Sequence, residues 1–185
     1  KDQLIEMGLA DVAYYEKNSF VIGRLPGNPE KTAIGFIAHV DTADFEAENI
    51  QPQIHENYDG KDVCLNKEKA IYMTTAEFPN LKDYVGETLI TTDGTTLLGA
   101  DDKAGIAEII DALRILQTMD AHKRGDVWVA FGPDEEIGTG ADRFDAADFP
   151  VAFAYTMDSG RVDHMEYETF NAARSEEHTS ELQSH

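Results

Sequence analysis

The almost entirely apolar run TAIGFIAHV, residues 32–40, constrains the fold of this chain most. A strand that is covered on both faces has such a continuous apolar sequence, because neither face meets water. Residues 127–131 and 151–157 have the same character, and residues 103–119 between these runs carry apolar side chains at helical spacing. Buried strands that alternate with helices predict an α/β fold with a mixed, partly parallel sheet and flanking helices.

The other predicted elements are short. Residues 41–88 form a long segment in which apolar and polar side chains are mixed. We expect a few short strands there, in an irregular excursion from the sheet. The remaining predictions are the end of a helix at 1–7, strands at 12–15, 20–25 and 164–170, a hairpin of 89–92 with 96–98 around Asp93-Gly94, and a short helix at 140–147.

The two ends of the chain differ from the rest. The opening KDQLIEMGL reads as the middle of a helix, so we expect the chain to begin inside a longer protein. In the last stretch, RSEEHTSELQSH, Leu182 is the only apolar side chain, and this stretch cannot form a core element. It also resembles a translated sequencing adapter. We therefore interpret residues 174–185 as a non-native tail and residues 1–173 as the folded part.

The charge of the chain excludes several partners. Fifteen basic against 36 acidic side chains give a formal net charge of -21. Nucleic acids and anionic membrane surfaces both attract basic proteins, so we predict neither as a partner. No apolar run approaches the roughly 18–20 residues of a membrane span. Cys64 is the single cysteine, which excludes an internal disulfide framework and is typical of a reducing compartment.

Side chains that can bind a metal follow the predicted strands. In an open α/β sheet, ligands bind beyond the carboxyl ends of the strands. Several carboxylates gathered at one edge without a cation would raise one another's pKa and cost stability, which one or two divalent metal ions would avoid. The candidate residues at four predicted strand ends are His39, Asp101, Glu135, Glu136 and Asp158.

Each of these residues also has an ordinary structural interpretation. A strand-end histidine is often structural, an Asp before a helix caps it, paired Glu residues in a loop are often solvated, and an Asp before Ser-Gly is a common turn residue. Their joint occurrence favours the metal site. Asp41 adds to it, because it lies two residues from His39 and faces the same way in a strand. Its carboxylate can orient the imidazole for a metal.

Four segments in order also resemble a known family. The strings GFIAHVDT, LITTDGTTLLGADDKAGIAEI, VAFGPDEEIGTGA and AYTMDSG are similar to the peptidase T family. These are cytoplasmic aminotripeptidases of the di-zinc metallopeptidase superfamily, which also contains carboxypeptidase G, dipeptidases and aminoacylases. The resemblance covers about residues 1–173 and implies a partial catalytic metallopeptidase domain. The HxD, DDKAG and DEE motifs belong to the whole superfamily, whereas ITTDGTTLLGADDKAG is specific to the tripeptidase branch.

The resemblance implies a site for two zinc ions. His39 and Asp158 would bind the first zinc, Asp101 would bridge both, and Glu136 would bind the second. The family supplies a further, distal histidine to the second zinc after a lid domain. Neither the lid nor a histidine in a matching context is found here, so we expect a chain truncated at both ends, with one tight and one weak zinc site.

The resemblance also implies the catalytic groups. Glu135 would be the general base that takes a proton from a metal-bridging water, and Asp41 would hold His39. The family has a cis peptide bond at the position of Asp101–Asp102.

The function implied by the resemblance is hydrolysis of the N-terminal peptide bond of tripeptides, by a parent protein that forms a homodimer through its lid. We expect this chain alone to be inactive. The alternatives are another di-zinc enzyme, such as a dipeptidase or aminoacylase, and a noncatalytic acidic metal-binding domain.

Overall fold

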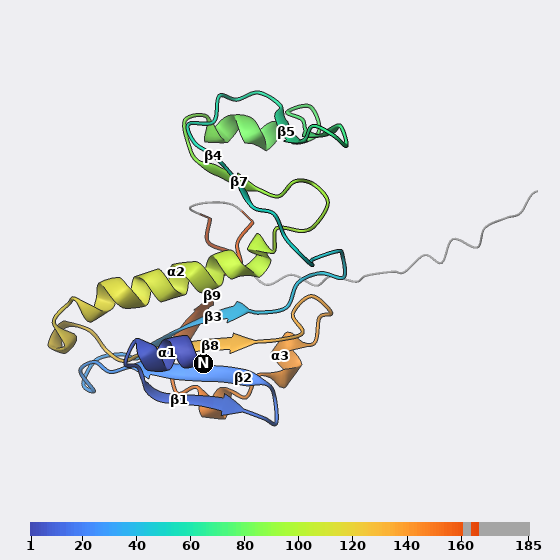
Figure 1. The fold of residues 1–185 in the computed structure, drawn as a ribbon. Helices are drawn as coiled ribbons and strands as arrows, with labels where there is room; N and C mark the ends of the chain where they lie inside the picture. Colours follow the sequence, from blue (N-terminus) through green and yellow to red (C-terminus); the bar gives the residue numbers. More distant parts are fainter. Residues whose placement is uncertain (161–163, 167–185) are drawn as a thin grey trace, which may run out of the picture.

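The structure is a computed structural model that describes residues 1–160 and 164–166. Within them, five strands form one sheet in the order β1-β2-β8-β3-β9 (Figure 1). β3 runs parallel to β8 and β9, whereas β2 runs antiparallel to β1 and β8. The predicted α/β class with a mixed, partly parallel sheet is therefore confirmed. The strands are β1 (Ala10–Tyr15), β2 (Phe20–Leu25), β3 (Ile34–His39), β8 (Val127–Gly132) and β9 (Phe153–Thr156).

Both faces of the sheet are covered, as the apolar runs predict. The short helix α1 (Asp2–Glu6) and the long helix α2 (Ala100–Gln117) lie on one face, where Leu4, Ile109 and Leu113 join the larger core cluster (Figure 1). On the other face, Phe149 packs in a second cluster, next to α3 (Gly140–Arg143) and the 3-10 turn η3 (Ala146–Asp148).

Strand β8 shows how one apolar run serves two cores. Val127, Val129 and Phe131 belong to the cluster under α2, whereas Ala130 belongs to the opposite cluster and Trp128 packs against it. Successive side chains of a strand point to opposite faces, so a strand covered on both sides needs apolar residues at every position.

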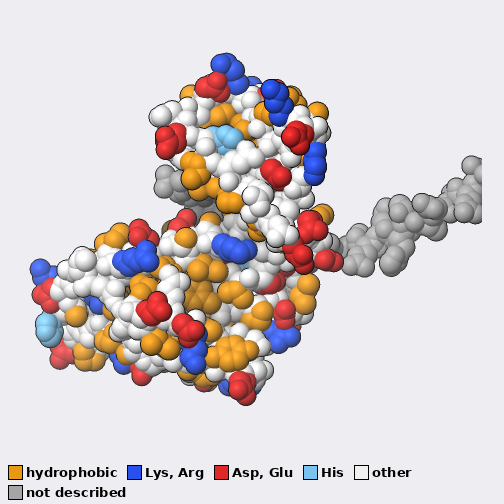
Figure 2. Space-filling view, in the orientation of Figure 1, with side chains coloured by type: hydrophobic (Ala, Val, Ile, Leu, Met, Phe, Trp, Pro, Cys, Tyr) orange, Lys and Arg blue, Asp and Glu red, His pale blue; other side chains and the backbone are white. Residues whose placement is uncertain are grey.

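Residues 53–91 form a small lobe that projects away from the sheet near the N-terminal start of α2 (Figures 1 and 2). Its strands pair only with one another, β4 with β7 and β5 with β6, both antiparallel. Its buried apolar cluster consists of Tyr58, Val63 and Leu81. The expected irregular excursion with short strands is therefore confirmed. The elements are β4 (Gln53–His55), β5 (Val63–Asn66), β6 (Ile71–Met73), the 3-10 helix η1 (Pro79–Tyr84) and β7 (Leu89–Thr91).

The predicted hairpin around Asp93-Gly94 is wrong. β7 pairs with β4 instead, and residues 96–98 form no strand. In this turn, backbone groups form hydrogen bonds with nearby side chains. The amide of Thr95 donates to the Asp93 carboxylate, and the hydroxyl of Thr92 donates to the carbonyl of Thr96. Such local hydrogen bonds offer the backbone an alternative to a strand ladder.

The run at residues 151–157 forms a strand but not a buried one. All four residues of β9 are exposed, because β9 pairs with β3 alone and lies at the edge of the described sheet. In the strand predicted at 164–170, residues 164–166 have no regular structure, and 167–170 lie outside the described residues, as does the predicted tail at 174–185. No helix in the described part of the chain has the length and apolar character needed to cross a bilayer.

Candidate metal site

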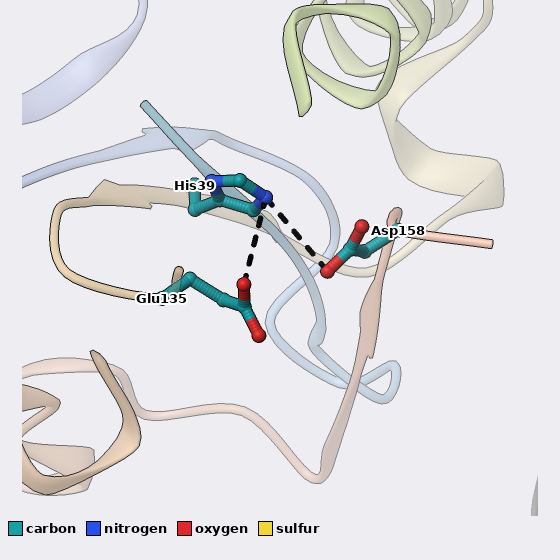
Figure 3. Close-up of side chains that lie close together, drawn as sticks. All are labelled: His39, Glu135 and Asp158. Carbon is teal, nitrogen blue, oxygen red and sulfur yellow. Dashed lines mark ion pairs between the residues drawn. The ribbon is translucent and has the colours of Figure 1, made fainter. Parts of the chain in front are cut away.

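The candidate ligands meet at the edge where β3, β8 and β9 end. His39 is the last residue of β3, and its Nε2 lies 2.9 Å from Asp101 Oδ1. The same nitrogen lies 3.9 Å from Glu135 Oε2 and 3.9 Å from Asp158 Oδ2. Figure 3 shows the side chains of Glu135 and Asp158 turned toward this imidazole. The parallel arrangement explains the meeting, because parallel strands present their carboxyl ends at one edge.

Asp101 lies on a different element from the one predicted. It does not follow a strand of the sheet but lies at the start of α2, where Asp101 and Asp102 have non-helical backbone angles. Gly99 precedes them with a φ of +73°, a conformation that glycine adopts without steric cost. The peptide bond between Asp101 and Asp102 is cis, as the family resemblance implies. This turn leads the Asp101 carboxylate to His39 instead of along the helix.

Among the residues that the structure describes, two groups of donor atoms lie close enough to hold a metal ion. One consists of His39, Glu135 and Asp158, and the other of His39, Asp101 and Glu136. In each group the donor atoms lie within 4.8 Å of one another. The grouping differs from the one implied by the resemblance, in which Asp101 is shared: here both groups share His39, whose Nε2 lies within 4 Å of Asp101, Glu135 and Asp158. One imidazole and several carboxylates form a donor set suited to a divalent ion such as Zn²⁺.

Asp41 supports both halves of the site. Its carbonyl oxygen lies 3.0 Å from His39 Nδ1, and its Oδ1 lies 3.3 Å from the same nitrogen. The carboxylate also accepts hydrogen bonds from the backbone amides of Glu135, at 3.3 Å, and Glu136, at 3.1 Å. The sequence predicts only the contact with His39. The structure adds that the backbone carbonyl of Asp41 makes the shorter contact with the imidazole ring, and that its carboxylate also holds the loop that carries the two glutamates.

Crowded negative charge shifts the ionisation of the site. Burial lowers the pKa of His39, but the hydrogen bond with Asp101 and the nearby carboxylates outweigh it, so its pKa lies above the ordinary value. Burial raises the pKa of Glu135, and the charge of Asp158 raises it further. Burial also raises the pKa of Asp158. A bound cation would favour the ionised form of each carboxylate.

Asp102 is a buried acid to which the sequence assigned no site role. Its side chain accepts hydrogen bonds from the backbone amides of His39 and Gly105, both at 3.2 Å. Burial, together with the charge of Asp158, raises the pKa of Asp102 to about 6. The only sequence signal for this residue is its place before a helix, which predicts a cap. The bond to Gly105 is such a cap, but the bond to His39 has no local signature.

A cavity of about 400 Å³ adjoins the site. Its wall includes the polar side chains of His39, Glu135 and Asp158, and apolar ones such as Phe20 and Phe144. These two rings meet edge to face, with their centroids 5.2 Å apart. A mostly apolar hollow with a few convergent polar groups is the usual form of a small-molecule site.

Comparison with known proteins shows that the chain is similar to peptidases. Residues 91–172 match the family described as Peptidase family M20/M25/M40. The chain is 60% identical to Peptidase T of Enterococcus faecalis over 179 residues and 57% identical to Peptidase T of Fusobacterium nucleatum over 177 residues. Each match covers 95% of this chain, but only 44% and 43% of the relatives. The chain thus spans less than half the length of the curated relatives it matches.

Solved structures support the fold. A tripeptidase from Staphylococcus aureus superposes with a TM-score of 0.61 at 23% identity, over 86% of this chain and 36% of that one. The aminopeptidase PepT from Bacillus cereus gives a TM-score of 0.61 at 24% identity, over 85% and 36%. Taken together, these matches confirm that the chain is similar to proteins named Peptidase T along nearly its whole length and to the peptidase family M20/M25/M40 over residues 91–172.

Proposed function

We propose that this chain carries the metal-binding part of an aminopeptidase that cleaves the N-terminal peptide bond of tripeptides. The observation that supports it best is the meeting of one imidazole and several carboxylates at a single sheet edge, in a chain 60% identical to a Peptidase T. We assign His39, Asp101 and Asp158 to a first zinc ion and Asp101 and Glu136 to a second. When bound, two such ions would polarise the scissile carbonyl and lower the pKa of a shared water.

Glu135 is the general base in this proposal. Its Oε2 lies 3.9 Å from His39 Nε2, in the donor group that also contains Asp158, and burial raises its pKa, which favours proton uptake. Glu135 takes a proton from the attacking water and passes it to the amide nitrogen as the carbon–nitrogen bond breaks. Asp41 keeps Glu135 in place through the loop amides and orients His39 through Nδ1. The neighbouring cavity offers room for a substrate side chain.

The metal part of this proposal is tested on the 185-residue chain by calorimetric titration with Zn²⁺. We expect one tight site and one weak site, because the second ion has only two assigned ligands, whereas zinc prefers four. We also expect no tripeptide turnover by this chain. Two equally tight sites, or clear turnover, would contradict the ligand assignment.

The catalytic part is tested in a chimaera, in which this chain replaces the matching 44% of Enterococcus faecalis Peptidase T. A panel of tripeptides, dipeptides and acyl-amino acids then defines the reaction, and we expect tripeptides to be preferred. Glu135→Gln should lower turnover by about 10²–10⁴-fold with metal content unchanged, as is typical for a lost general base. The matched control is Asp134→Asn, because Asp134 pairs with Arg143 outside the donor cluster. A loss of metal in Glu135→Gln would show that Glu135 is a ligand.

Two further expectations belong to the whole protein. We propose that it acts in the cytoplasm and forms a homodimer through a lid domain. Sedimentation and cell fractionation of the full-length protein test both.

A further inference from the structure

The contacts of Asp102 join the end of β3 to the start of α2. Its Oδ2 accepts a hydrogen bond from the amide of His39 at the end of β3, and its Oδ1 accepts one from the amide of Gly105 in the first turn of α2. The Asp102 side chain is buried, with 4% of its surface exposed. Within the described residues it forms no ion pair, so these backbone amides are its hydrogen-bond partners.

The amide of His39 needs this partner because the strand ladder ends there. The amide of Met157 donates to the carbonyl of Ile37, just beyond the last residue pair of β3 and β9. Groups two residues apart in a strand point to the same side, so the next β3 amide on this side is that of His39. If β9 were longer, one of its backbone carbonyls would accept the hydrogen bond from the His39 amide. The Asp102 carboxylate accepts this hydrogen bond instead. Asp102 thus replaces one rung of the sheet.

Gly105 brings the third segment to the same place. A side-chain carbon on Gly105 would lie 1.9 Å from the carbonyl oxygen of Met157 and 2.5 Å from Asp102 Oδ1. The helix backbone therefore touches the end of β9, directly before Asp158. We call these contacts of Asp102 and Gly105 with His39 and Met157 the Asp102–Gly105 junction.

We propose that Asp102 is a positioning residue for the metal site, acting through the Asp102–Gly105 junction. The junction sets the relative places of the β3 end, the α2 start and the β9 end, which carry His39, Asp101 and Asp158. This proposal rests on the proposed metal-binding function. It adds that Asp102 binds no metal itself and acts by holding the backbone segments that carry the metal ligands.

The chemistry requires a carboxylate at this position. Two amide N–H groups donate to two different oxygens, and a carboxylate offers an acceptor at each. An asparagine would present its NH₂ group to one of these amides, and a buried donor would be left without an acceptor. A glutamate would need room for an extra methylene where Gly105 already lies against the carboxylate.

The test compares Zn²⁺ affinity in variants of the 185-residue chain. Asp102→Asn should bind Zn²⁺ about 10–100-fold more weakly, the usual cost of losing a group that orients metal ligands. Gly105→Ala should weaken binding similarly, although it removes no charge. Asp111→Asn, an exposed position on the same helix, controls for charge, and Ala104→Gly, exposed in the same turn, controls for helix stability. A loss in Asp102→Asn with none in folded Gly105→Ala would overturn the proposal, since Asp102 would then act by charge alone.

A second measurement needs neither metal nor the alanine variant. Amide hydrogen exchange by NMR in the zinc-free chain should show His39 and Gly105 protected in the wild type and fast-exchanging in Asp102→Asn, whereas Val129 stays protected in both. Unchanged exchange at His39 would overturn the proposal. A wild-type chain that binds no Zn²⁺ would instead contradict the proposed function, and the exchange result would still decide whether Asp102 holds the end of β3.

Discussion

The five-stranded sheet and the small lobe differ most in how much apolar surface they bury. The sheet has a cluster on each face, and its residues include Val129 and Ala130 with no exposed surface. The small lobe has a single cluster of Tyr58, Val63 and Leu81, exposed by 5–8%. Two connecting segments, residues 40–52 and 92–99, join the halves (Figure 1).

The candidate metal ligands belong to the sheet half, and Asp41, which supports them, lies at the start of the first connecting segment. The ligands lie at strand ends, in the loop after β8 and at the start of α2. Stability and metal binding should therefore depend on the sheet half, whereas changes in the lobe should remain local. Four predictions test this difference.

The largest effect is expected for Leu113→Ala in the core under α2. Leu113 has 1% of its surface exposed, so the shortened side chain leaves a cavity that costs about 2–5 kcal/mol of unfolding free energy. Urea denaturation followed by circular dichroism measures this loss. A loss below about 1 kcal/mol would mean that the sheet half is less tightly packed than its burial indicates.

The next effect is expected for Asp41→Ala. Removal of this carboxylate frees the loop amides of Glu135 and Glu136 and leaves the His39 ring only its contact with the Asp41 backbone carbonyl, so Zn²⁺ affinity should fall about 10–100-fold. Calorimetry checks this, with Asp44→Ala as the control, because Asp44 is exposed and lies in the same segment. Equal affinities of the two variants would exclude Asp41 from the site.

Leu81→Ala in the lobe is the matched counterpart of Leu113→Ala. Leu81 is nearly as buried, but its cluster is small and can collapse around the gap, so we expect a loss at or below about 2 kcal/mol. Faster amide exchange should be confined to residues 53–91, and Zn²⁺ affinity should not change. A global loss of stability, or weaker metal binding, would show that the two halves act as one unit.

The smallest effect is expected at the outer face of the lobe. Ile54 and Ile90 lie opposite each other in the β4–β7 pair, with 68% and 58% of their surface exposed. Replacing both by threonine should change the unfolding free energy by no more than about 0.5 kcal/mol, as for most surface substitutions. Thermal melting of the double variant checks this. A clear loss would mean that this pair is covered by other parts of the protein in solution.

The sequence predicted the elements whose signal is local. The bounds predicted for β2, residues 20–25, match the structure, and α2 and β8 differ by a few residues at their ends. Apolar periodicity explains this success, because it depends only on which face of each element is buried. The candidate ligands are likewise predicted from strand ends, and the structure places them in two groups of neighbouring donor atoms that share His39.

The sequence did not predict features that depend on distant partners. β7 pairs with β4, which lies well before it in the chain, so the local turn at Asp93-Gly94 pointed to the wrong neighbour. The exposure of β9 depends on what lies beside it in the sheet, not on its own residues. Asp102 bonds to an amide 63 positions away, and a short acidic side chain before a helix reads simply as a cap.

The central place of β3 also affects how the protein is made. β3 pairs with β8 and β9 and with no earlier strand, and its first residue pair with β8 joins Ile34 to Val127. During synthesis from the N-terminus, this apolar strand leaves the ribosome long before either neighbour exists. Both of its edges then remain open to other chains until residue 127 has been added, and an unpaired apolar edge is a template for aggregation. The strand that carries His39 is therefore a segment that a chaperone bound to the nascent chain would protect from aggregation.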